Sequence, residues 1–105
     1  MQFDTDSYEN EDFSSRIMEM EDISKKKFTG CKFRRADFSD VSVIYGCTFD
    51  TCDFAGARLN GVNIKQSAFL SCQFIGQCVT IAEHLTEGKY SPEEKVQGTF
   101  FTGIA

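Results

Sequence analysis

The sequence has no long apolar run, and its first residues are polar and acidic. Within 105 residues no stretch is apolar over the length of a signal-peptide core or a membrane span, and the chain begins "MQFDTDSYENED". We therefore expect a cytoplasmic protein without membrane contact. The length and the 41% hydrophobic content fit one domain with one modest core.

Residues typical of catalytic and metal sites are also scarce. His84 is the only histidine, and the sequence has no phosphate-binding glycine loop, nucleophile elbow or paired-histidine motif. A zinc site would need four converging ligands, whereas the cysteines recur beside phenylalanines. We expect no enzyme activity, no cofactor and no metal site.

Basic residues are too dispersed for a nucleic-acid footprint, whereas acidic residues gather at one end. The formal net charge is -5. Residues 1–23 contain one base, Arg16, and eight acids: Asp4, Asp6, Glu9, Glu11, Asp12, Glu19, Glu21 and Asp22. Residues 28–79 are nearly neutral, and the run Lys25, Lys26 and Lys27 is short. We expect no direct contact with nucleic acid.

Large apolar residues recur at every fifth position, which is the period of neither a helix nor a strand. In "FTGCKFRRADFSDV" they are Phe28, Phe33 and Phe38. The series continues at Val43 and, after one extra residue, at Phe49, Phe54, Leu59, Ile64, Phe69, Phe74 and Val79. For the nine centres from Phe33 to Phe74, the residues two places before are Cys31, Ala36, Val41, Cys47, Cys52, Ala57, Val62, Ser67 and Cys72. Such a short fixed period indicates a coiled β-structure rather than a helical repeat.

The segments "FTGCKFRRADFSD", "CTFDTCDFAGARLNGVNI" and "SAFLSCQFIG" resemble the pentapeptide-repeat family. The resemblance covers residues 26–79 and implies an all-β solenoid, a short right-handed quadrilateral β-helix in which four pentapeptides form one coil. Equivalent residues of successive coils should stack in columns about 4.8 Å apart. The predicted columns are Phe28, Phe49 and Phe69; Phe33, Phe54 and Phe74; Phe38, Leu59 and Val79; and Val43 and Ile64.

This repeat also predicts the state of the five cysteines, which should be reduced because no secretory signal is present and the number is odd. Cys31, Cys47, Cys52 and Cys72 occupy the small positions, so we expect them to be small buried hydrophobes. Cys78 directly precedes a centre and should point outward.

Residues 1–25 continue the five-residue spacing but carry charge in the small positions. The centres would be Phe3, Tyr8, Phe13, Met18 and Ile23, preceded by residues such as Asp6 and Glu11. Burying unpaired charges costs several kcal/mol each. We therefore expect an irregular acidic N-terminal cap or a degenerate repeat rather than a regular coil.

Residues 80–105 are expected to form a small helical cap, because an open solenoid end exposes strand edges. Thr80 and Glu83 form a capping box with a stop at Gly88, and a second helical turn should follow Ser91. The tail "GTFFTGIA" either completes this cap or binds a second subunit. Because most soluble assemblies close as two-fold dimers, we expect a homodimer through the C-terminal region, with a contact formed by Leu85, Phe100 and Phe101.

These features favour a non-enzymatic protein–protein interaction module with binding or regulatory function. The family resemblance implies an alternative, a DNA-mimic inhibitor or protector of DNA gyrase or topoisomerase. The predicted coils are not acidic and span only about 12 Å at strand spacing. Mimicry of DNA would therefore depend on the acidic N-terminal segment or on a dimer.

Overall fold

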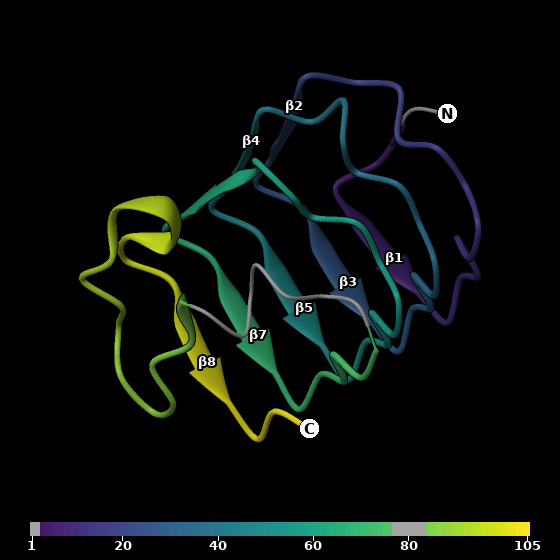
Figure 1. Cartoon of the computed structure of the whole chain (residues 1–105). Coiled ribbons are helices and arrows are strands. Elements are labelled where there is room, and N and C mark those ends of the chain that lie inside the picture. The colour runs from purple at the N-terminus through teal and green to yellow at the C-terminus, as the bar shows by residue number, and fades with distance from the viewer. Residues whose placement is uncertain (1–2, 77–83) are drawn as a thin grey trace.

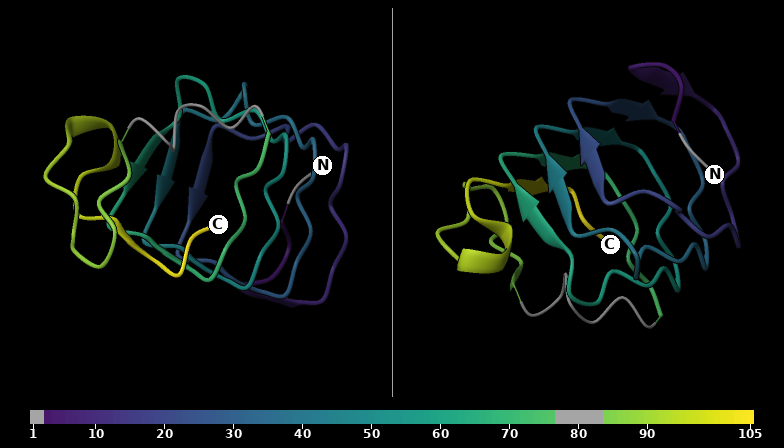
Figure 2. Two further views of the ribbon diagram at one scale, coloured as in Figure 1. Left: turned by 60° about the horizontal axis from the view of Figure 1, so that its bottom comes forward. Right: turned by 90° about the horizontal axis from the view of Figure 1, so that it is seen from above.

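Three-residue strands, separated by turns, form the walls of a coil in the computed structural model, which describes residues 3–76 and 84–105. One wall is the parallel sheet β1-β3-β5-β7-β8, with the strands Ser7–Glu9, Lys27–Thr29, Thr48–Asp50, Ala68–Leu70 and Phe100–Thr102. A second is the parallel sheet β2-β4-β6, with the strands Asp22–Ser24, Val43–Tyr45 and Asn63–Lys65. The chain is an all-β solenoid of about 3 turns, as Figures 1 and 2 show.

Two further walls are built from isolated parallel bridges between successive coils. One row joins Asp12, Lys32, Asp53 and Gln73, and the other joins Ile17, Asp37 and Arg58. The coil therefore has four sides, as the five-residue period predicts. Its winding hand stays a prediction.

Residues with positive φ turn the chain at the corners. At the corner after the first wall these are Asn10, Gly30, Thr51, Ser71 and Gly103, with φ between 54° and 63°. Glycine is favoured at Gly30 by its φ of 63° and by space, because a Cβ there would lie 2.5 Å from Asn10 Oδ1 and would force that side chain to move. The left-handed corners thus limit each wall to a short strand.

Aromatic columns form the core, and they confirm the predicted stacking. In the first column Phe28 stacks on Phe49 and Phe49 on Phe69, with ring centroids 5.0 and 4.7 Å apart. In the second, Phe54 stacks on Phe33 and Phe74 at 5.0 and 5.1 Å. Rings of neighbouring columns meet edge to face, which is a favourable aromatic geometry. Val79 lies outside the described residues.

The predicted centre Val43 is wrong, because Ile44 fills that position. Ile44 is buried and pairs with Ile23 and Ile64, whereas Val43 is only half-buried. Phe28 pairs with Phe49, twenty-one residues on, whereas the coils before and after have twenty residues. The extra residue therefore lies before Ile44 rather than after Val43.

Residues 3–25 form a coil of the same kind, so of the two alternatives expected for residues 1–25 the degenerate repeat describes them and the irregular cap does not. β1 pairs with β3 and β2 pairs with β4, and Phe13, Met18 and Ile23 are buried. The small positions of this end coil, Asp6, Glu11, Arg16 and Glu21, are exposed. Charge is tolerated there because this coil forms the end of the solenoid, where its inward positions still reach water.

The C-terminal segment covers the last coil. β8 adds a fifth strand to the first wall, and the 3-10 helix η1, Glu94–Val96, places buried Val96 beside β6. Glu87 and Tyr90 form bridges to the edge of β8 that does not pair with β7. The predicted helix from Thr80 to Gly88 is not confirmed: its first residues, 80–83, lie outside the described part, and residues 85–88 are not helical, since Glu87 forms a bridge to Phe101. Within 3–76 and 84–105, no helix is long and apolar enough to cross a bilayer.

Enlarging a small inward residue should overpack the coil. Ala57 is fully buried, whereas Ala55 lies in the turn just before it and is half-buried. We expect Ala57→Leu to lower the free energy of unfolding in urea by about 1–3 kcal/mol. Ala55→Leu is the matched control and should change it by less than about 0.5 kcal/mol. Equal effects of both substitutions would contradict the inward placement of Ala57.

Candidate interaction surface

The densest charge on the molecule lies on the first coil, residues 3–25, which we call the acidic coil. All eight of its carboxylates are exposed, and it contains only two bases, Arg16 and Lys25. Lys26 begins the next coil, and its ammonium group lies 3.1 Å from Asp6 Oδ1. The acidic coil is therefore a strongly negative end on an otherwise nearly neutral solenoid.

Backbone hydrogen bonds to the second coil hold the acidic coil in place. The amides of Asn10, Phe13 and Met18 donate to carbonyls of that coil over 2.7–2.9 Å. Phe3 lies across the open end, with its ring 5.1–5.4 Å from those of Tyr8, Phe13 and Phe28. The carboxylates are therefore mounted on an ordered backbone.

Two aspartates keep their charge down to a lower pH than usual. Asp12 Oδ1 accepts a hydrogen bond from the Ser14 amide and Asp37 Oδ1 accepts one from the Ser39 amide, each over 2.9 Å. Hydrogen bonds from Ser14 and Ser39 lower the pKa of Asp12 and of Asp37 respectively. Their ionised forms also fix the turns that follow them.

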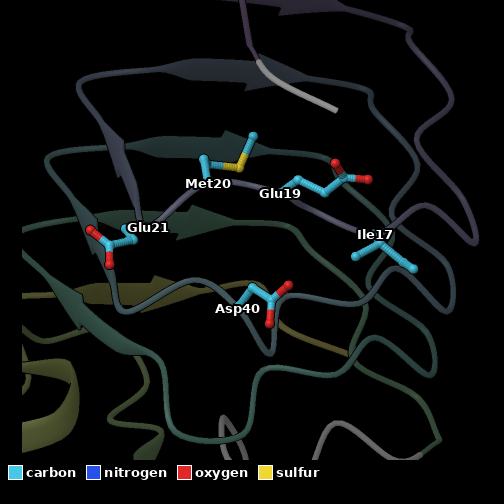
Figure 3. A pocket seen from close by; sticks show the side chains of 5 residues that line it. All are labelled: Ile17, Glu19, Met20, Glu21 and Asp40. Carbon is cyan, nitrogen blue, oxygen red and sulfur yellow. The ribbon is translucent and has the colours of Figure 1, made fainter.

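An open groove of about 530 Å³ lies where the acidic coil meets the second coil. Its lining combines two apolar side chains with three carboxylates: Ile17, Met20, Glu19, Glu21 and Asp40. Figure 3 shows the first four on one stretch of the acidic coil, with Asp40 on the adjacent coil. We call it the insertion groove, because the extra residue of the repeat lies beside it.

The extra residue shapes this groove. The amides of Ser42 and Val43 both donate to the carbonyl of Glu21, over 2.8 and 3.3 Å, so two residues of one coil oppose one residue of the other. Just before them, the Val41 amide donates to the Phe38 carbonyl over 2.9 Å and closes the turn that carries Asp40. The regular repeat and its single irregularity thus together position Glu21 and Asp40.

A second hollow of about 520 Å³ lies on the other side of Ile17 and has a different character. It is lined by Arg35, Arg58 and Asp37, with Gly56 and Gly76 at the neighbouring corner. Ile17 therefore separates an acidic groove from a hollow with two arginines.

The predicted contact of Leu85, Phe100 and Phe101 is not one surface within the chain. Phe101 is 0% exposed and stacks on Phe69 at 5.3 Å, so it belongs to the core. Phe100 lies on the opposite side of β8 and contacts Tyr90, and Leu85 is 37% exposed. Alternation along a strand explains why adjacent phenylalanines point to opposite sides.

The sequence reasoning missed the insertion groove and Tyr90, which is 71% exposed. Ile17 carried a signal, since it is a large apolar residue directly before the centre Met18, at a position that faces outward. The sequence also revealed that an extra residue was present, although its place was misassigned. We find no comparable signal for Tyr90.

The four described cysteines lie in the small inward positions. Their thiols donate to carbonyls of the preceding coil: Cys31 to Tyr8, Cys47 to Ile23, Cys52 to Phe28 and Cys72 to Phe49. Burial raises the pKa of Cys31 and Cys47, and a hydrogen bond to Cys72, together with burial, raises that of Cys52. Residues 3–76 and 84–105 hold no group of three potential metal ligands. Cys78 lies outside these ranges.

The chain combines a five-residue period, four rows of parallel pairs and stacked centres. The chain is a β-solenoid with a five-residue repeat. No protein-family model and no curated protein matches it. A solved structure of trypsin-treated QnrB1, described as a plasmid-mediated fluoroquinolone resistance protein, aligns with a TM-score of 0.48 and 20% identity. The alignment covers 93% of this repeat protein and 42% of the QnrB1 chain, less than half its length.

Burial of the thiols predicts slow chemical modification. In the native protein we expect Cys31, Cys47, Cys52 and Cys72 to react with a maleimide at least about tenfold more slowly than in guanidinium, because a thiol must be exposed and ionised to react. Peptide mass spectrometry would resolve each site. Cys78 should react first, as its expected outward position implies. Rapid labelling of the four in the native protein would contradict their inward placement.

Proposed function

We propose that this chain is a non-enzymatic protein-binding module of the cytoplasm, which presents its acidic coil to a cationic surface on a partner protein. The observation that carries this proposal is the set of eight exposed carboxylates on an ordered coil, against two bases. Because the backbone is already fixed, binding would not have to order it, which lowers the entropic cost of association. The concentrated charge would also steer a cationic partner toward this end.

A protein partner fits this surface better than nucleic acid does. Phosphates carry the same sign of charge as the acidic coil, and phosphate contacts supply most of the affinity for nucleic acid. The remaining coils are near neutral and offer no basic stripe. The partner should therefore carry clustered lysine or arginine side chains.

The alternative function is that of a DNA-mimic inhibitor or protector of DNA gyrase or topoisomerase, which the family resemblance supports. Duplex DNA as long as the 31 Å longest dimension of the chain carries roughly 18 phosphate charges (31/1.7). The whole chain has a net charge of -5. Its charge is a patch at one end rather than a continuous stripe, which favours the general binding role over mimicry by a single chain.

A homodimer through the C-terminal region remains part of the proposal for the mimic. Leu85, Tyr90 and the outer side of Phe100 are the apolar groups that such a contact could bury. Two chains joined there would place an acidic coil at each far end. Phe101 would stay in the core of each chain.

Neutralising part of the acidic coil should weaken partner binding. We expect the triple variant Glu9→Gln, Glu11→Gln, Asp22→Asn to bind the captured protein about tenfold more weakly, at about 0.5 kcal/mol for each exposed charge pair lost. The immobilised chain would capture the partner from host lysate, and purified partner would be titrated at two salt concentrations. Wild-type affinity should fall as salt rises.

The control variant removes the same charge elsewhere, with Asp50→Asn, Glu93→Gln and Glu94→Gln. It should bind like the wild type. A partner that binds both variants equally would refute the role of the acidic coil. A DNA supercoiling assay with purified gyrase distinguishes the two functions, since only a gyrase-directed protein should change the rate of supercoiling.

A further inference from the structure

The insertion groove has the chemistry of a docking site for one particular kind of segment. We propose that it binds an extended stretch of a partner protein in which an aliphatic side chain has a lysine or arginine two residues before or after it. This inference rests on the proposed function and specifies where on the acidic coil the partner is anchored.

The apolar part of the groove accounts for the aliphatic side chain. Ile17 stands directly before a centre, at a position that faces water, and is 53% exposed. A large apolar side chain at such a position is available for a contact. Met20 lines the same groove, beyond Glu19 on the same stretch of chain, and packs partly against the core (Figure 3). Methionine adapts its shape to different apolar partners, so this pair can accept an aliphatic side chain without a matched pocket.

The charged part of the groove selects the sign of the ligand. Three of the five lining side chains are carboxylates and none is basic. A metal ion is a poor occupant, because the described residues contain no group of three ligands that could hold one. A lysine or arginine side chain does not need several ligands directed at one point, because its charge can pair with carboxylates that stand apart.

The backbone fixes the two parts relative to each other. Asp40 stands on the turn closed between Phe38 and Val41, and the Glu21 carbonyl accepts two hydrogen bonds from the adjacent coil. The groove is therefore preorganised. In an extended segment, residues two apart point to the same side and lie about 6.6 Å from each other, so one side can present both a cation and an aliphatic group.

Titration with a short peptide tests this proposal directly. The probe is the end-blocked peptide Arg-Ser-Leu-Ser-Arg, added to isotope-labelled full chain and followed by amide chemical shifts. We expect shifts centred on Ile17, Met20, Glu21 and Asp40. The peptide Arg-Ser-Ser-Ser-Arg should bind about fivefold more weakly, because it lacks the apolar contact.

Matched variants separate the groove from general charge. Asp40→Asn should weaken binding about two- to fivefold, whereas Glu9→Gln, on the first wall of the acidic coil and outside the groove, should weaken it less than Asp40→Asn does. Ile17→Ser should likewise weaken it, whereas Ile75→Ser, which removes an apolar side chain that is 63% exposed, should leave it unchanged.

Three results would overturn the proposal. Shifts spread over the whole acidic coil, with equal effects of Asp40→Asn and Glu9→Gln, would show attraction by charge alone; the proposed function would survive and the groove would not. Equal binding of Glu-Ser-Leu-Ser-Glu would refute the charge selection. Absence of shifts at millimolar peptide would remove the groove as an anchor, and capture of a salt-sensitive partner would then show whether the broader function stands.

Discussion

Stacking of equivalent side chains at the strand spacing is the interaction on which the rest of this structure depends. Successive parallel strands lie about 4.8 Å apart, so the rings of one column must stack at nearly that distance. They do so at 4.7–5.4 Å from Tyr8 through Phe101. A residue of different size would disturb two neighbours at once, which explains why one large and one small residue recur in each unit. The period is thus a consequence of the packing.

The same constraint explains where charge can enter the repeat. An inward position between two coils has no water, and there the chain uses cysteine, alanine, valine or serine. At the first coil the inward positions reach water, so Asp6, Glu11 and Glu21 occupy them while remaining exposed. Charged inward residues also keep a free strand edge from pairing with other chains. The opposite end is closed differently, by Val96 and the strand β8.

Much of the fold could be predicted from the sequence, because each column repeats its own residue type. The error at Val43 arose because two adjacent apolar residues could each continue the series, and only the pairing of Ile44 with Ile23 and Ile64 decides between them. The irregular cap, one of the two alternatives expected for residues 1–25, was wrong because the cost of burying charge was applied to a coil whose inward positions reach water. Phe100 and Phe101 point to opposite sides because both lie in the strand β8, and the tail sequence alone did not show that a strand forms there. The insertion groove depends on which carbonyl the bulged amides contact, and no sequence pattern contains that information.

The central claim is that the eight carboxylates are held on a regular coil, and amide hydrogen exchange tests it most directly. The amides of Asn10, Phe13 and Met18 donate to the second coil, so they should exchange at least about a hundredfold more slowly than in an unstructured chain. Gly56, which lies within the repeat, offers an internal comparison: its amide donates to the Ile75 carbonyl and should be protected to a similar degree. Exchange of Asn10, Phe13 and Met18 at the unstructured rate, with Gly56 still protected, would contradict the account, because the acidic residues would then belong to a flexible tail.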